Sequence, residues 1–383
     1  MSSVTALTIA PKEMDYLRAK FRGYYREHLV PPRLLHEREF GFGFERKIEY
    51  RHKQFESAHG LQEFIQRESP FFISYSAAYY RYPGATPMGK KEPHGAELIF
   101  DLDAGYEHEN HNPMLCTHCL NKVREETHAL VEDYLLGDFG FSKKNLSINF
   151  SGQKGYHVHV DDDSVRSLSQ EARKQLSNYV TAQSLDMDRV FVKQDLGSRK
   201  YVLRGPTSAS RGWSGRVYAK ARGLVERGNE EEMKKEGLSK KQINFIKENQ
   251  ALMIQNIDRG NWGAVKGLET VWRDLLQRTM QLKSVNVDER VSYDMVRLIR
   301  MPQSLHGDTG FIAKTMSQQE LPTFDPTKEA LAFSRTARVR MKMKEAAAFE
   351  LQGESYALKK EEEKELPENV AVLLLCKKKA ILV

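Results

Sequence analysis

The sequence has few cysteines and no long apolar run, and each shortage excludes a class of protein. Three cysteines in 383 residues cannot form a disulfide framework. Cys116 and Cys119 are spaced C-x-x-C, which favours a cytosolic metal site over a bridge. The longest uninterrupted apolar stretch, Val370–Cys376, is far short of the roughly 20 residues that cross a bilayer, so no membrane span is expected. The N-terminal segment has no basic stretch before an apolar core, so we expect no signal peptide.

The residues that are present describe a folded, basic protein. Hydrophobic residues make up 40% and aromatic residues 10% of the chain, which argues against disorder. The length allows two or three modules at roughly 100–200 residues each. The formal charge of +7 and the pI of about 9.0 favour an anionic partner such as a nucleic acid or a nucleotide.

The apolar spacing predicts an α+β fold, a mixed α/β core that an inserted helical subdomain interrupts. Met14, Leu17, Phe21 and Tyr24 lie on one face of a helix. Alternating segments predict strands at 40–44, 73–79 and 97–103, and a hairpin of 146–151 and 156–160. A further amphipathic helix follows from Val123 to Tyr134.

We predict three consecutive parts: residues 1–165, 166–283 and 284–383. The first and last parts form the core, and the middle part is a mainly helical insert. Its clearest helix starts at Ser239 with a capping box to Gln242. One face of that helix carries Ile243, Ile246, Met253 and Ile257. In the last part, 285–291 and 310–316 alternate like strands, and the charged run 327–365 is expected to be helical. A closing hairpin of 370–376 and 380–383 is expected at the end.

Three aspartates are the first candidate site. In the segment 97–103, Leu98, Phe100 and Leu102 point one way, so Asp101 and Asp103 share the other face of the strand. Asp288 has a similar setting between valines. Clustered carboxylates repel unless a divalent cation lies between them, so a Mg²⁺ or Mn²⁺ site is predicted. The alternative is a solvated strand face.

The hairpin loop is the second candidate site. Its glycines, Gly152 and Gly155, allow backbone N–H groups to approach an anion. Ser151, Lys154 and His157 would together hold a triphosphate, whereas the alternative is an ordinary hairpin with exposed polar residues. His159 shares the strand face but lies farther from the loop.

Arg300 and His306 form a third candidate, because they flank a turn fixed by Pro302. An arginine held between apolar neighbours suits bidentate contact with a phosphate.

A fourth candidate is the segment 108–119. His108, His111, Cys116 and Cys119 supply the four ligands of a structural zinc site, while His118 is expected to point away. The alternative is a reduced cysteine pair beside surface histidines. The stretch 38–51, with polar residues between aromatic positions, is predicted to be a sheet edge.

Taken together, these motifs resemble the catalytic (small) subunit of archaeal and eukaryotic DNA primase, most closely the archaeal one. The segments 97–103 and 151–157, Asp288, and the segment 297–306 occur in the order and at roughly the separation of that family's motifs. Arg38-Glu-Phe, Tyr50-Arg51 and the run from Val370 resemble its terminal motifs. Nearly the whole chain is covered.

The resemblance implies template-directed synthesis of short RNA primers on single-stranded DNA, at the start of DNA replication. Asp101, Asp103 and Asp288 would bind two Mg²⁺ or Mn²⁺ ions, Ser151, Lys154, His157, Arg300 and His306 would contact the phosphates of the incoming nucleotide, and Glu39 and Arg51 would lie near the same pocket. It also implies a zinc knuckle, a large primase subunit as partner in a heterodimer, and a cytoplasmic, nucleoid-associated location in an archaeal cell.

The chain departs from the family pattern in two places. Gln153 and Lys154 stand where some relatives have two arginines, and the knuckle offers two histidines and two cysteines where relatives use more cysteines. Two other functions stay open: a primase-polymerase that mainly extends with deoxynucleotides in repair or translesion synthesis, and a non-catalytic zinc-containing nucleic-acid-binding module.

Overall fold

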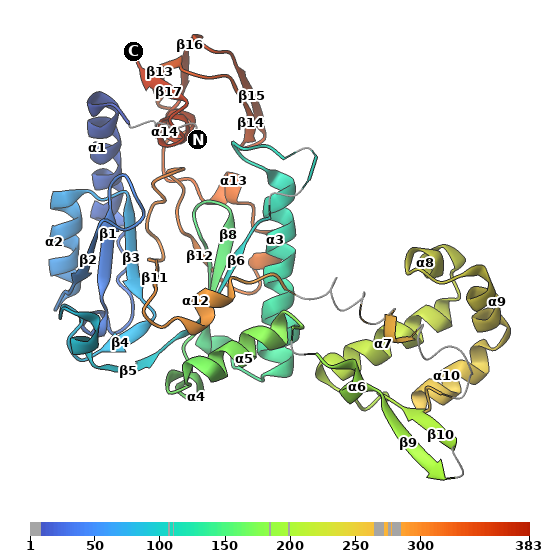
Figure 1. Ribbon diagram of the computed structural model, residues 1–383. Helices are drawn as coiled ribbons and strands as arrows, with labels where there is room; N and C mark the ends of the chain where they lie inside the picture. The colour runs from blue at the N-terminus through green and yellow to red at the C-terminus, as the bar shows by residue number, and fades with distance from the viewer. Residues whose placement is uncertain are drawn as a thin grey trace, which may run out of the picture. The chain divides into compact units, whose positions relative to one another are not determined.

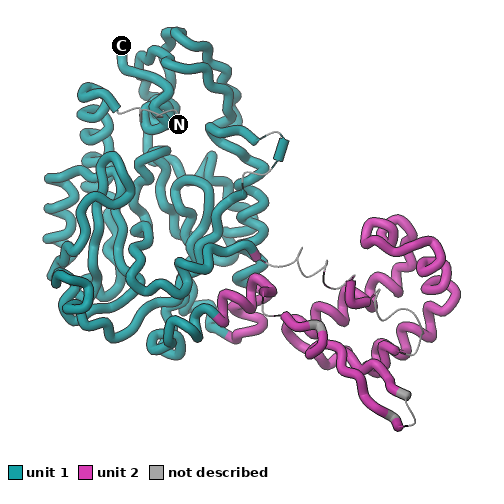
Figure 2. The backbone as a smooth tube through the Cα atoms, in the orientation of Figure 1, with its two compact units in different colours: residues 1–131, 141–174, 286–383 teal, residues 132–140, 175–285 magenta. Residues whose placement is uncertain are grey.

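The computed structural model describes residues 9–105, 108–109, 111–183, 185–197, 200–263, 272–274, 277 and 285–383. The chain divides into two units (Figure 2). The first comprises residues 1–131, 141–174 and 286–383, and the second comprises 132–140 and 175–285. The sequence analysis placed the boundaries of the middle part after residues 165 and 283.

Two four-stranded antiparallel sheets form the centre of the first unit (Figure 1). One has the strand order β11-β3-β1-β2, with β1 at Phe40–Gly43, β2 at Tyr50–Lys53, β3 at Phe72–Ser76 and β11 at Leu298–Arg300. The other has the order β12-β7-β8-β6, with β6 at Leu98–Asp103, β7 at Leu146–Phe150, β8 at Gly155–Val160 and β12 at Thr315–Met316. The strands predicted at 40–44 and 97–103 and the 146–160 hairpin are confirmed. The strand predicted at 73–79 is instead divided between β3 and the next strand, Ala78–Tyr80, which belongs to another sheet. The stretch 38–51 was predicted to be a sheet edge, but it supplies the inner strand β1 as well as the start of the edge strand β2.

Helices cover the outer sides of these two sheets. Helices α1 (Pro11–Glu27) and α2 (Ala58–Glu68) lie beside the β1–β3 sheet, and α3 (Thr117–Ala129) packs against β6 and β8. The predicted apolar face of α1 is buried at Leu17, Phe21 and Tyr24. Short elements connect these parts: η1 (Leu35–Glu37), β4 (Ala78–Tyr80), η2 (Met88–Lys91), β5 (Pro93–Ala96), η4 (Lys143–Asn145), α4 (Asp163–Arg166), α12 (Glu289–Tyr293), η5 (Leu321–Thr323) and α13 (Pro326–Glu329).

The second unit is largely helical, as expected, but it contains a β-hairpin that the sequence did not suggest. The hairpin pairs β9 (Val192–Gly197) with β10 (Lys200–Arg204). The helices are α6 (Met187–Val190), α7 (Gly212–Arg227), α8 (Glu230–Lys235), α9 (Lys240–Glu248) and α10 (Gln250–Asp258). The chain passes between the two units within η3 (Leu130–Asp138) and α5 (Gln170–Val180).

The Ser239–Gln242 capping box is present at the start of α9. The single helix predicted from Ser239 to Ile257 is instead two helices, because the chain breaks at Asn249, which caps both. The apolar face nevertheless continues across the break, since Ile243, Ile246, Met253 and Ile257 are all buried.

The C-terminal predictions were wrong in two respects. The run 327–365 contains four strands rather than a long helix: β13 (Arg338–Met343), β14 (Ala347–Leu351), β15 (Glu354–Leu358) and β16 (Glu363–Pro367). The expected closing hairpin is absent there: residues 370–376 lie in helix α14 (Glu368–Cys376), and β17 (Ala380–Leu382) pairs with β13. Every residue of α14 is buried, and a wholly apolar run has no periodicity that separates a buried helix from a buried strand.

The fold class is therefore the predicted one, a mixed α/β core with a largely helical second unit. Among the described residues, no helix combines the length and the apolar character needed to span a membrane.

Candidate active site

Strand β6 presents two carboxylates on one face. It pairs with β8 in antiparallel register, with Asp101 opposite His157 and Asp103 opposite Gly155. Leu98, Phe100 and Leu102 on the other face are fully buried. Side-chain alternation then leaves the Asp101 side chain 19% exposed and the Asp103 side chain 49% exposed.

Asp288 reaches the same place from a distant part of the chain. The strand predicted over 285–291 is wrong: Asp288 is the N-cap of α12, and its side chain accepts a hydrogen bond from the Arg290 N–H at 3.0 Å. Its own backbone N–H donates to the carbonyl oxygen of Asp101 at 2.8 Å. The structure thus brings Asp101, Asp103 and Asp288 together; we call these three residues the carboxylate centre.

The negative charge of the carboxylate centre is only partly balanced. Lys154 lies 3.2 Å from Asp103 and Arg297 lies 3.1 Å from Asp288, whereas Asp101 has no lysine or arginine partner among the described residues. Burial, followed by the charges of Asp103 and Asp288, raises the pKa of Asp101 to about 7. The buried Oδ1 of Asp101 has no hydrogen-bond partner among the described residues, although His157 Nε2 lies 3.5 Å away. Oxygen ligands with this charge suit a hard divalent cation, so the three residues fit a Mg²⁺ or Mn²⁺ site.

The hairpin loop lies directly beside these carboxylates. Ser151 Oγ accepts a hydrogen bond from the Gly155 N–H at 3.1 Å, which fixes the turn. Lys154 Nζ lies 3.2 Å from Oδ2 of Asp103. Gly152 has φ of +83°, and a Cβ there would come within 2.8 Å of His306 Cβ, so glycine is needed both for the backbone and for the close approach. The loop is therefore packed against the 297–306 segment.

Arg300 and His306 are buried next to the loop. Burial lowers the pKa of Arg300 to about 10, and its Nη1 has no hydrogen-bond partner within the described chain. His306 Nδ1 accepts a hydrogen bond from the Asp308 N–H at 3.1 Å, so the neutral ring carries its proton on Nε2. Burial also lowers the pKa of His157 well below its usual value, which keeps this ring neutral too.

Arg300, His157 and His306 form a buried cluster next to the carboxylate centre, which we call the anion-binding pocket after the role proposed for it below. The Arg300 guanidinium and the His306 ring both lie against the Phe72 ring, at 5.4 Å and 5.6 Å from its centre. The charge of Arg300 also lowers the pKa of both His157 and His306. A buried guanidinium with an unused donor gains strongly from an anion, because charge-assisted hydrogen bonds are among the strongest in proteins.

Glu39 and Arg51 lie in a neighbouring ion-pair cluster. Arg51 Nε donates to Glu39 Oε1 at 2.8 Å, and the fully buried Glu39 also lies 3.5 Å from Lys91 Nζ. Arg51 Nη2 donates to the carbonyl oxygen of Val296 at 3.2 Å, in the segment that leads into β11. The structure thus connects these two residues to the site through the backbone beside Arg297.

Two residues at the site were missed from the sequence. Arg297 Nη1 lies 3.1 Å from Oδ2 of Asp288, and its place three residues before Arg300 was a usable signal. Lys47, in the β1–β2 turn, lowers the pKa of Asp101 through its positive charge. It also lowers the pKa of both His157 and His306. An exposed lysine in a turn gave no sequence signal.

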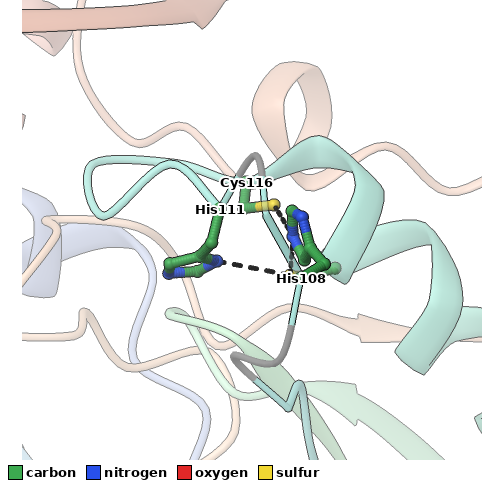
Figure 3. A group of neighbouring side chains, drawn as sticks. His108, His111 and Cys116 are labelled. Carbon is green, nitrogen blue, oxygen red and sulfur yellow. Dashed lines mark hydrogen bonds between the residues drawn. The ribbon is translucent and has the colours of Figure 1, made fainter.

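His108, His111, Cys116 and Cys119 form a second group, which we call the His/Cys cluster. One ligand atom from each lies within 4.8 Å of the others. Figure 3 shows three of these residues, His108, His111 and Cys116. His108 Nε2 is 3.1 Å from the sulfur atoms of both cysteines, and Cys119 Sγ is 3.5 Å from His111 Nδ1. Burial, with the neighbouring Cys116 thiol, raises the pKa of Cys119 to about 11.

The arrangement of the His/Cys cluster suits a tetrahedral metal ion. Ligands about 2.0–2.3 Å from a zinc ion would lie at separations like those observed. His118 is not one of the four, although its ring lies 5.1 Å from that of His108.

Comparison with known proteins places the chain in a family. Residues 100–317 match the model of the DNA primase small subunit family. The DNA primase small subunit PriS of Methanothrix thermoacetophila is 36% identical, over 96% of this chain and 98% of that protein. The chain belongs to the DNA primase small subunit family. PriS of Methanococcoides burtonii is 34% identical, over 96% of this chain and 97% of that protein.

The family expected from the motifs is thereby confirmed, and with it a DNA-directed nucleotidyltransferase. A solved structure of the polymerase domain of Mycobacterium tuberculosis ligase D in complex with DNA covers 85% of this chain and 91% of its own, at 14% identity and a TM-score of 0.39. That similarity is too low to support any conclusion about function.

Proposed function

We propose that this chain synthesises short RNA primers on single-stranded DNA, using the carboxylate centre and the adjacent anion-binding pocket. The observation that carries the proposal is the convergence of Asp101, Asp103 and Asp288 beside the buried Arg300 and His306. Carboxylates for metal ions and cationic donors for phosphates are the two parts that phosphoryl transfer requires.

Each group has a distinct role in this proposal. Asp101, Asp103 and Asp288 hold two Mg²⁺ or Mn²⁺ ions, which when bound lower the pKa of the attacking 3′-hydroxyl and neutralise the leaving pyrophosphate. Arg300 donates to the triphosphate through its unused Nη1, and His306 donates through Nε2–H. Ser151 shapes the loop, and Lys154 and His157 line the triphosphate position between the loop and Asp101.

Glu39 and Arg51 position this machinery from outside the pocket. Their ion pair anchors Val296, and the next residue, Arg297, holds Asp288. We further propose that 1–165 and 284–383 form the catalytic core, since every candidate residue lies in these two ranges. The insert, 166–283, contributes none of them.

The His/Cys cluster is proposed to hold a structural zinc ion, because four protein ligands leave no open position for catalysis. The proposed partners are a large primase subunit in a heterodimer, the DNA template and nucleoside triphosphates. The proposed location is the cytoplasm, at the nucleoid.

A primer-synthesis assay tests the function. The chain is incubated with single-stranded DNA, no primer, Mg²⁺ or Mn²⁺, and either ribonucleotides or deoxynucleotides. Short products from ribonucleotides support the proposal, and the Asp101→Asn/Asp103→Asn variant should make none. Extension of a supplied primer with deoxynucleotides alone would favour the repair polymerase. Salt-sensitive DNA binding without any incorporation would favour the binding module.

A further inference from the structure

An open groove on the first unit lies outside the site described above. It has a volume of about 910 Å³ and is bordered by α1, α2, strands β1 and β2, and the turn between these strands. Three aromatic rings that are only partly buried line it: Phe44, Tyr50 and Phe64. We call this the aromatic groove.

Cationic side chains accompany these rings. The Arg18 guanidinium lies 4.9 Å from the centre of the Phe44 ring, and that of Arg67 lies 5.5 Å from the centre of the Phe64 ring. The buried Nε of Arg18 has no hydrogen-bond partner in the described part of the chain. Tyr50 is 56% exposed and meets Phe44 edge to face, at 6.2 Å between ring centres.

The charges of the groove favour an anion. Its cationic lining residues are Arg18, Arg46, Lys53 and Arg67, against three glutamates. The carboxylate of Glu49 accepts hydrogen bonds from the N–H groups of Phe44, Glu45 and Arg46, which hold it against the turn. Glu68 pairs with Arg67 at 2.8 Å. Four cations against three carboxylates leave the lining with a net positive charge.

We propose that the aromatic groove binds single-stranded nucleic acid, with bases stacked on Tyr50 and Phe44 and the phosphates near Arg18, Lys53 and Arg67. Alternating aromatic and cationic side chains in an open groove are how proteins hold single strands without reading their sequence. A single strand presents a planar base next to every phosphate, which matches rings and cations in one groove, whereas the carboxylates of an acidic protein surface carry no ring.

The β1–β2 turn connects the groove to the carboxylate centre. Phe44 and Tyr50 at the ends of the turn line the groove, whereas Lys47 in its middle acts electrostatically on Asp101, His157 and His306. The contacts of Arg51, the residue after Tyr50, also connect the two places. Arg51 donates a hydrogen bond to the carbonyl oxygen of Val296, and the next residue, Arg297, pairs with Asp288. If the proposed function holds, the strand in the groove is the template.

The test measures binding without catalysis. Fluorescence anisotropy with labelled oligodeoxythymidylate is recorded for the full chain without nucleotides and without added Mg²⁺ or Mn²⁺. No chelator is used, so that zinc in the His/Cys cluster is retained. Tyr50→Ala should weaken binding by about five- to a hundredfold, the value of one stacked base. Tyr50→Phe should bind like the wild type. Tyr82→Ala is the matched control, because Tyr82 is 51% exposed but does not line the groove.

Two further measurements separate stacking from charge. An abasic oligomer of equal length should bind the wild type more weakly than oligodeoxythymidylate, and Tyr50→Ala should lose that difference. Lys53→Gln should reduce the salt dependence of binding by about 0.7 in log–log slope.

Equal affinity of wild type and Tyr50→Ala for oligodeoxythymidylate would overturn the proposal. So would a Tyr50→Ala variant that binds DNA normally but fails to associate with a large primase subunit, because the groove would then be a protein interface. Neither result depends on incorporation, so failure of the proposed function remains distinguishable: it would appear as inactivity in the primer assay with normal binding.

Discussion

The carboxylate centre and the His/Cys cluster are two candidate metal sites of the first unit that are assembled in opposite ways. The His/Cys cluster takes all four ligands from the single segment 108–119. The carboxylate centre joins two residues of β6 to Asp288, with the second unit between them in the chain. Short spacing within one segment makes the first site a local property, whereas the second exists only when β6 and α12 meet.

The two sites also differ in their electrostatics. In the carboxylate centre, burial and like charges raise the pKa of Asp101 to about 7. A bound divalent cation would relieve the repulsion between these carboxylates. In the His/Cys cluster, the imidazole of His108 lies 3.1 Å from both cysteine sulfur atoms, and burial raises the pKa of the Cys119 thiol to about 11. The first arrangement suits ions that exchange during a reaction, and the second suits an ion that stays.

The largest expected effect comes from the carboxylate centre. Asp103→Asn should lower nucleotide incorporation by at least about a hundredfold, because one ligand and its charge are lost at the reacting phosphate. Incorporation is measured by primer synthesis on single-stranded DNA, and folding by circular dichroism.

Asp163→Asn is the matched control, because this side chain is 94% exposed and lies in α4. If folded Asp103→Asn kept normal activity, the carboxylate centre would not be the catalytic metal site.

The His/Cys cluster should respond in metal content. Cys119→Ser should remove most of the bound zinc and lower the melting temperature, since a structural zinc ion contributes folding free energy directly. Zinc is measured by atomic absorption on protein purified without chelators.

Cys376→Ser controls for this change, because it also places a hydroxyl at a buried cysteine, in α14. Full zinc occupancy in Cys119→Ser would show that these four residues do not act as one site.

A substitution of Arg300 tests the anion-binding pocket. Arg300→Lys keeps the charge but loses the planar donor pair, so the KM for nucleoside triphosphates should rise about ten- to a hundredfold, with a smaller effect on kcat. Steady-state kinetics separate the two constants. Arg340→Lys, at an exposed ion pair with Glu363, should change neither, and an unaltered KM in Arg300→Lys would remove Arg300 from the nucleotide contacts.

The remaining expected effect is on the stability of the metal-free protein. Because the pKa of Asp101 is about 7 in the fold and 3.8 ordinarily, the folded chain binds more protons between these values. Stability from this group is therefore present below about pH 4 and lost as the pH rises to about 7, by at most roughly 4 kcal/mol.

The measurement is thermal unfolding in EDTA as a function of pH. Asp101→Asn should be the more stable protein at pH 8, with its advantage disappearing toward pH 4, and Mg²⁺ should stabilise the wild type more than the variant. If the melting temperatures of the two proteins changed with pH in parallel, the negative charge on Asp101 would not destabilise the folded protein.

Much of the site was predictable because its motifs are local. The alternation of Leu98, Phe100 and Leu102 with Asp101 and Asp103 specified both a strand and its polar face, and the structure shows both. The four residues of the His/Cys cluster also came from spacing alone. Lys47 did not, because its importance depends on where the β1–β2 turn lies.

The failures differ in their physical origin. The charged run 327–365 was expected to be a helix, yet β13 pairs with β16 and with β17, both farther along the chain. The hairpin of β14 and β15 is local, and the sequence analysis missed it. The apolar run 370–376 has no polar face to reveal its period, so burial on all sides hid the helix. For Asp288 the valine pattern suggested a strand, but the aspartate caps a helix instead.

The sequence by itself determined the family, the mixed α/β class, the polar face of β6 and the composition of the His/Cys cluster, because each depends on neighbours within a few residues. The contact of Asp288 with Asp101 follows only from the tertiary structure, and so does the effect of Lys47, in the β1–β2 turn, on the pKa of Asp101. The tertiary structure also decided that a groove of rings and cations lies beyond that turn. These contacts join segments that are far apart in the chain. Tertiary packing determines them, because the secondary-structure preference of a short segment does not specify its distant partners.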